Sequence, residues 1–188
     1  MKTILVANQK GGVGKTMLVD EICSMLEKDE IIYSLYDMDQ QGSMFHQPQK
    51  REDAQVTIVD TPGALQKDMK KWIEEADMII VPTLMCGSEM APFERMIQIL
   101  EPYQETKEIL FILNRWNRFS MTRDFTSWFE AKYPNLKSMI LVESIPLQQA
   151  ISHRESIQTF NPRNQAAKQL LGIYGYIKTQ LNLKEGWR

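Results

Sequence analysis

The chain has 188 residues, of which 43% are apolar, and a formal net charge of −2. This length fits one compact domain with a sizeable core, and no apolar run approaches the roughly 20 residues that a membrane-spanning helix needs. Cys23 and Cys86 are far apart in sequence and match no metal or redox spacing, which favours reduced core thiols in a cytosolic protein.

The predicted elements alternate between short apolar strands and stretches of helical periodicity. The strands are nearly continuous apolar runs, as expected where helices cover both faces of a parallel sheet. The predicted fold is therefore a doubly wound α/β domain with a mostly parallel sheet. The expected strands are 3–8, 31–37, 55–60, 77–82, 108–113 and 138–143, and the expected helices are 16–29, 65–76, 88–101, 121–132, 147–158 and 163–181.

Three further features of the sequence give less specific expectations. Residues 43–53 are polar and contain a proline, so we expect a loop with at most one short turn. The strand at 77–82 is expected to end at its proline. His46 and His153 belong to no triad or metal pattern, and we expect both at the surface.

The segment NQKGGVGKTM, residues 8–17, joins the first predicted strand to the first predicted helix. Its glycines let backbone N–H groups surround phosphate oxygens without Cβ clashes, and the helix N-terminus adds a positive dipole end. In such a loop Lys15 bridges the terminal phosphates and the Thr16 hydroxyl binds Mg²⁺. Because strand, loop, Lys–Thr pair and helix occur in the required order, we predict a nucleotide-binding site.

Acidic residues end the next two predicted strands. The run VTIVD ends at Asp60, which is placed like the Walker B carboxylate that holds Mg²⁺, often through water. The run YDMDQQG carries Asp37 and Asp39, whose spacing would point both carboxylates to one side of an extended segment. Two like charges there require a cation or donors to offset them, although ordinary loop capping remains the alternative.

Lys10 followed by GGVGKT, then DMDQQG and IVDTPG, resembles the ParA/MinD family of deviant Walker A ATPases, whose motif is K-G-G-x-G-K-[ST]. The segments DMIIVP, FILNR and ESIP extend the resemblance over essentially the whole chain. The sequence is most similar to small plasmid-partition ParA proteins without an N-terminal DNA-reading domain. The resemblance implies one P-loop ATPase domain over residues 1–188, which uses ATP and Mg²⁺.

The resemblance also implies roles for individual residues. Lys10 would cross an ATP-dependent homodimer to the partner's nucleotide, adding charge only in the dimer. Asp39 would position or activate the attacking water. The chain departs from the family at Gln40, where proline is common, and at Met17, where threonine is common. The implied catalytic residues are Lys10, Lys15 and Asp39, the metal-binding residues are Thr16, Asp37 and Asp60, and the nucleotide-binding residues are Lys10, Gly11, Gly12, Val13, Gly14, Lys15, Thr16, Met17, Asn114 and Pro146.

Charge is distributed unevenly along the chain. Residues 1–110 carry a net charge of −8 and residues 111–188 a net charge of +6, which indicates a basic face for a polyanion or simply solvated helices. The resemblance implies non-specific DNA binding by this region. The candidates are Arg115, Arg118, Arg123, Arg154, Arg163 and Lys168.

The implied partners are a second copy of the chain, DNA and a centromere-binding, ParB-like protein that stimulates hydrolysis, at a cytoplasmic, nucleoid-associated location. A membrane-positioning ATPase like MinD is one alternative, but the C-terminal GIYGYIKTQLNL is poorly basic, so we expect it to pack on the domain without stable membrane binding. A metabolic or metal-insertion enzyme of the same superfamily is another alternative. Such enzymes often carry interface cysteines or a large substrate lobe, and neither is evident here.

Overall fold

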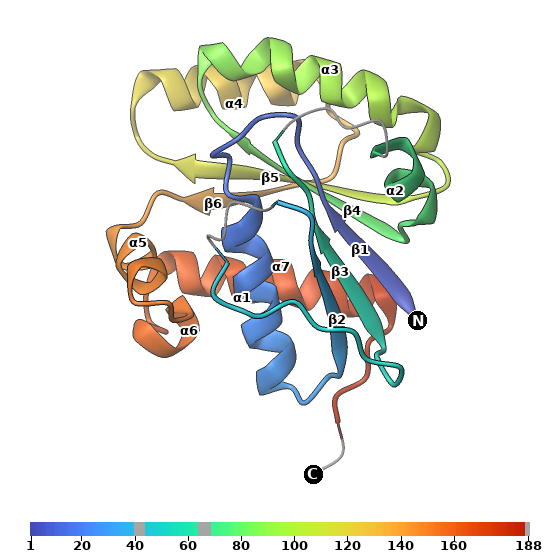
Figure 1. Cartoon of the computed structure of the whole chain (residues 1–188). Coiled ribbons are helices and arrows are strands. Elements are labelled where there is room, and N and C mark those ends of the chain that lie inside the picture. Colours follow the sequence, from blue (N-terminus) through green and yellow to red (C-terminus); the bar gives the residue numbers. More distant parts are fainter. Residues whose placement is uncertain (40–43, 64–68, 187–188) are drawn as a thin grey trace.

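The computed structural model describes residues 1–39, 44–63 and 69–186. Its centre is a six-stranded sheet with the strand order β2-β3-β1-β4-β5-β6, and every neighbouring pair of strands is parallel (Figure 1). The predicted doubly wound α/β fold is confirmed. The strands are β1 (Lys2–Val6), β2 (Tyr33–Asp37), β3 (Val56–Asp60), β4 (Met78–Leu84), β5 (Glu108–Trp116) and β6 (Ser138–Val142).

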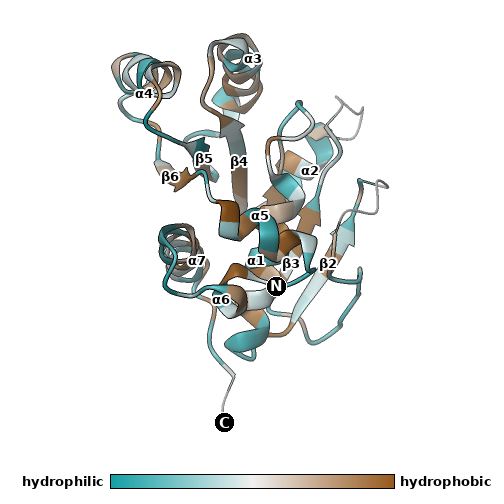
Figure 2. Ribbon diagram, turned by 90° about the vertical axis from the view of Figure 1, so that its left-hand side faces the viewer, coloured by the Kyte–Doolittle hydropathy of each residue, from teal (hydrophilic) through white to brown (hydrophobic). Residues whose placement is uncertain are grey.

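Helices cover both faces of this sheet, as Figures 1 and 2 show. One core cluster lies under α1 and α7, and a second lies under α2, α3 and α4. Successive residues of β1 alternate between the clusters, since Ile4 and Val6 belong to the first and Leu5 to the second. The helices are α1 (Lys15–Lys28), α2 (Met69–Glu75), α3 (Met90–Leu100), α4 (Ser120–Lys132), α5 (Ile145–Ser152), α6 (Ile157–Phe160) and α7 (Gln165–Leu181), with short 3₁₀ turns η1 (Gly87–Glu89) and η2 (Glu101–Tyr103).

Several predicted boundaries differ from the structure, including the end of β5, which extends to Trp116. The helix expected at 147–158 is divided into α5 and α6, because Arg154 has a left-handed φ of 57° that ends α5. The strand β4 continues through Pro82 to Leu84 instead of ending at the proline. The carbonyl of Pro82 accepts a hydrogen bond from the side chain of Asn8, which lies beyond the end of β1. Because β1 has ended there, the N–H group that Pro82 lacks removes no hydrogen bond between the two strands.

Other expectations agree with the structure. The loop preceding β3 touches the sheet edge through one isolated antiparallel bridge between Leu35 and Gln49. The apolar side of α7 is buried in the core, including Ile173 and Ile177, so the C-terminal segment packs on the domain as expected. Cys23 is a buried free thiol, whereas Cys86 is only half-buried. None of the helices in the described ranges is long and apolar enough to cross a membrane. The start of the helix expected at 65–76 lies outside the described residues.

Candidate nucleotide-binding site

The loop between β1 and α1 has the backbone geometry of a phosphate-binding loop. Gly12 and Gly14 have φ values of 74° and 99°, in the left-handed region that favours glycine. Gly14 is the N-cap of α1, and no side chain caps that end of the helix, so N–H groups of the first turn are left for a ligand. A Cβ at Gly14 would lie 2.5 Å from Nδ2 of Asn114, so the position requires glycine on steric grounds as well.

Two buried asparagines hold this loop at its ends. Asn8 donates from Nδ2 to the carbonyl of Pro82 at 2.7 Å and accepts the backbone N–H of Lys10 at 2.9 Å. Asn114 donates from Nδ2 to the carbonyl of Val13 at 2.8 Å. The sequence reading missed Asn8, although a polar residue directly after an apolar strand was a usable signal. Both side chains fix the loop before any ligand binds.

Lys15 lies buried at the start of α1. Its Nζ donates to the carbonyl of Lys10 at 3.0 Å, which directs the ammonium back over the loop. Burial lowers its pKa, and the charges of Asp60 and Asp39 oppose that shift. A buried ammonium beside backbone N–H groups is an arrangement that phosphate oxygens complete.

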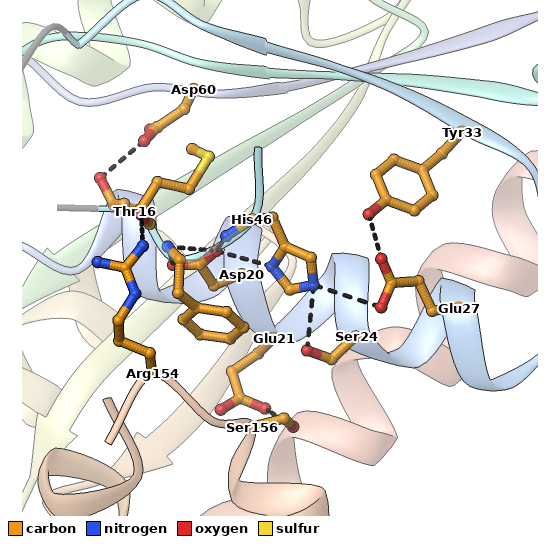
Figure 3. Close-up of polar contacts among 12 residues, drawn as sticks. Thr16, Asp20, Glu21, Ser24, Glu27, Tyr33, His46, Asp60, Arg154 and Ser156 are labelled. Atoms are coloured by element: carbon orange, nitrogen blue, oxygen red, sulfur yellow. Dashed lines mark hydrogen bonds and ion pairs between the residues drawn. The ribbon is translucent and has the colours of Figure 1, made fainter. Parts of the chain in front are cut away.

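Asp60 and Thr16 form the oxygen-rich part of the site. Thr16 donates from Oγ1 to Oδ2 of Asp60 at 2.7 Å (Figure 3). Asp60 is 0% exposed, and its Oδ1 has no hydrogen-bond partner within the described residues. Burial raises the pKa of Asp60 to about 6, against the opposing effects of Thr16 and Lys15. An unpartnered buried carboxylate oxygen beside a hydroxyl fits Mg²⁺, which prefers oxygen ligands.

The second strand brings Asp37 to the same edge of the sheet. Asp37 lies opposite Asp60 in the parallel register of β2 and β3. Burial raises the pKa of Asp37, the hydrogen bond from the backbone N–H of Asp39 opposes this shift, and the charges of Asp39 and Asp20 add to it. Within the described ranges no three His, Cys, Asp or Glu side chains group so as to hold a metal ion. Phosphates and water would therefore supply most of the coordination of Mg²⁺, which is its usual mode at nucleotide sites.

Asp39 lies two residues beyond the end of β2 and is half-buried. Its backbone N–H donates to Oδ1 of Asp37 at 2.9 Å. Its charge raises the pKa of both Lys15 and Asp60. Gln40, the departure from the family pattern, lies outside the described residues.

Gly14, Met17 and Asn114 all line one small pocket. Ser144 and Leu147 also line this pocket and were missed by the sequence reading, whereas Pro146 is not among its lining residues. Contact of Pro146 with a base therefore stays a prediction.

Comparison with known proteins agrees with this geometry. The family model described as the CobQ/CobB/MinD/ParA nucleotide binding domain matches residues 4–159. The chain belongs to this family. None of the curated protein sequences matches the chain at a significant level.

Solved structures of the ParA/MinD group share the fold. A complex of McdA from Cyanothece with ATP has a TM-score of 0.79 at 16% identity, covering 100% of this chain and 99% of that one. MinD from Aquifex aeolicus has a TM-score of 0.76 at 16% identity, covering 95% and 97%. A protein described as a plasmid partition protein from Borrelia burgdorferi B31, bound to AMPPNP, has a TM-score of 0.70 at 16% identity, covering 94% and 99%. At these identities the likeness shows the fold alone.

The expectation that His46 is a surface histidine is wrong for this member of the family. Its side chain is only 10% exposed, and its Nδ1 lies 2.8 Å from Oδ1 of Asp20 (Figure 3). The carboxylate of Asp20, on α1, also accepts the backbone N–H groups of Phe45 and His46. Arg154 donates to the carbonyl of Met44 at 3.1 Å. Asp20 and Arg154 therefore fix the start of the segment that resumes at Met44.

Two groups of basic residues in the C-terminal part differ in their surroundings. Lys132, Lys137 and Lys178 form ion pairs with Glu94, Glu108 and Asp29. The six DNA-binding candidates are all exposed, and none has an ion-pair partner among the residues that the structure describes. Arg118 lines one open groove together with Gln165 and Gln169 of α7, which places it near the start of that helix. Arg154 lies apart from this groove, at Met44.

Proposed function

We propose that the chain is a ParA-type partition ATPase. ATP binding would form a sandwich dimer, the dimer would bind DNA without sequence preference, and a partner protein would stimulate hydrolysis and release. The observation that carries this proposal is a set of exposed arginines, without ion pairs to other described residues, on a domain that also has a phosphate-binding loop. The apolar side of α7 is buried in the core, so it is not available to insert into a membrane as an anchor.

The proposed chemistry divides among the residues of the site. Backbone N–H groups of residues 11–16 and the ammonium of Lys15 hold the phosphates, and Asp39 holds the attacking water and takes its proton as the water oxygen bonds to the γ-phosphorus. The bond from that phosphorus to the ADP oxygen breaks, giving ADP and phosphate. Mg²⁺, held by Thr16 and Asp60 with Asp37 nearby, would offset charge on the phosphates. Lys10 of the partner subunit would add a further positive charge.

A binding experiment tests this function. Random-sequence duplex DNA and anionic liposomes are each titrated with the protein, in the presence of Mg-ATP or Mg-ADP, at several salt concentrations. We expect ATP-dependent binding to DNA, with log affinity falling by about 0.9 per neutralised phosphate for each unit of log salt. Two copies of a few arginines should therefore give a slope of several units. Retention by liposomes instead of DNA would favour the membrane-positioning alternative, and a strong preference for one short DNA sequence would contradict the proposal.

Charge-reversal variants locate the DNA-binding face. Arg118→Glu combined with Arg163→Glu should weaken binding to all sequences alike, while ATP-driven dimerisation stays intact. The matched control is Lys70→Glu with Lys71→Glu, the same change in charge on the exposed side of α2, which should leave DNA binding nearly unchanged. Arg154 is unsuited to this test because its replacement would also release Met44.

A further inference from the structure

Lys10 is paired with a carboxylate of its own subunit. Its Nζ forms an ion pair with Oε1 of Glu89, which ends the 3₁₀ turn η1 after β4. Glu89 is 1% exposed, and Lys10 is its sole ion-pair partner among the described residues. The thiol of Cys86 lies 3.9 Å from the same oxygen. A buried carboxylate with one cation depends on that cation, because removing it leaves an uncompensated buried charge.

The backbone and the side chain of Lys10 are held differently. Its N–H is fixed by Asn8 and its carbonyl accepts from Lys15, so the main chain is bound within the loop. Its side chain is 39% exposed and is attached to Glu89 only at its tip. The ammonium can therefore leave Glu89 by rotation of the side chain, without movement of the phosphate-binding loop.

We infer that Glu89 is an intrasubunit counter-ion that holds Lys10 in its own subunit until a nucleotide-bearing partner arrives. This inference rests on the proposed function, in which Lys10 acts on the partner's phosphates. One ammonium is a compact point charge, and it cannot serve both the buried carboxylate and the partner's nucleotide. Dimerisation must exchange one anion for the other, so the Glu89 pair opposes the dimer and sets how much nucleotide is needed to form it.

The same exchange would discriminate between nucleotides. Triphosphate carries more negative charge than diphosphate, so it competes better with a single carboxylate for Lys10. ADP, which lacks the γ-phosphate, would leave Lys10 on Glu89. The alternative is that Glu89 orients Lys10 for its role in the dimer. In that case, removing the charge of Glu89 would weaken the dimer instead of strengthening it.

The full chain with Glu89→Gln tests the inference, with light scattering across a range of ATP and ADP concentrations. We expect the ATP concentration at half-dimerisation to fall by about 1.5-fold to fivefold, the range for removing a partly exposed ion pair, and some dimer to form with ADP. The matched control is Glu94→Gln, which removes the carboxylate paired with exposed Lys132 and should leave the midpoint unchanged. Glu89→Asp, which keeps the charge and shortens the side chain, should shift the midpoint in the same direction as Glu89→Gln. It provides the same test if Glu89→Gln folds poorly. An unchanged or higher midpoint would overturn the inference.

A second measurement separates this inference from the proposed function. Amine-reactive labelling of the nucleotide-free monomer, read by mass spectrometry at Lys10, needs no dimer. Labelling of Lys10 should be slow in the wild type and faster in Glu89→Gln, while labelling of Lys70 stays the same. If the wild type never dimerises with ATP, the proposed function fails, whereas equal labelling of Lys10 in both proteins overturns the counter-ion role itself.

Discussion

The hydroxyl of Thr16 donates to the carboxylate of Asp60 at 2.7 Å, across the junction between the phosphate-binding loop and β3. This bond satisfies only one oxygen of a buried carboxylate, and the other has no partner among the described residues. Burial raises the pKa of Asp60 to about 6, so at neutral pH the folded, ligand-free protein carries a charge that the fold disfavours. A cation bound with the nucleotide would reverse this cost.

Asp60→Asn should therefore stabilise the ligand-free protein and remove its response to Mg-ATP. The neutral amide should raise the free energy of unfolding at pH 7.5 by about 1–3 kcal/mol, since the folded state no longer bears the disfavoured charge. Denaturant titrations with and without Mg-ATP measure both effects. Asp124→Asn, at an exposed position of α4, is the control and should change neither. Equal stabilisation of Asp60→Asn and the wild type by Mg-ATP would remove Asp60 from the metal site.

Asp39→Ala should give a protein that binds Mg-ATP, dimerises and stays on DNA. Loss of a group that positions water and accepts its proton typically lowers turnover by about 10²–10⁴-fold. Phosphate release, measured with DNA and the partner protein present, gives the rate. Asp53→Ala, an exposed carboxylate paired with Arg51, serves as the control. A loss much smaller than tenfold would reassign Asp39 to a structural role.

Gly63→Ala should weaken nucleotide binding through a direct clash. A Cβ at Gly63 would lie 2.7 Å from the backbone nitrogen of Gly11 and 2.8 Å from its Cα, so the phosphate-binding loop would have to move. Calorimetric titration with Mg-ATP should show a clear loss of affinity. Gly175→Ala on α7 meets nothing within 4 Å and should bind normally, while gaining about 0.5–1 kcal/mol of stability from the lower helix cost of alanine. Normal affinity of Gly63→Ala for Mg-ATP would mean that the phosphate-binding loop can move to accommodate the added methyl group without weakening nucleotide binding.

Glu21→Gln should change how stability depends on pH. Glu21 is buried on α1 and accepts from the Ser156 hydroxyl and the Ile157 N–H, and burial raises its pKa. Because the folded state favours the protonated form, this group's contribution is present below the unfolded pKa and is lost as pH rises through the folded pKa. Glutamine mimics the neutral form at every pH. The variant should therefore gain stability over the wild type as pH rises from about 4 to 8.

Thermal unfolding across that pH range measures the difference between the two proteins. Glu130→Gln, at an exposed position of α4, is the control and should show no such trend. A constant difference between Glu21→Gln and the wild type would mean that folding does not shift the pKa of Glu21.

Local patterns were enough to predict the sheet, most helices and the phosphate-binding loop. The alternation of apolar strands and amphipathic helices predicts the doubly wound fold, because the spacing of apolar residues within each element shows which of its faces is buried. The Lys15–Thr16 pair and its glycines are contiguous, and Asp37 and Asp60 meet because parallel strands place their carboxyl ends at one edge. The break at Arg154 was missed because no proline or glycine marks a left-handed residue there.

The sequence by itself was enough to predict a phosphate-binding glycine loop with a lysine before it. Only the tertiary structure decided what surrounds those residues. Glu89 is 79 positions from Lys10, and Ser156 is 135 positions from Glu21. His46 was expected at the surface, and its contact with Asp20 follows from the course of a loop with no periodicity of its own. Such pairs depend on how the elements pack in three dimensions. Desolvation makes each buried charge require a partner, but the spacing of residues along the sequence does not specify which residue that partner is.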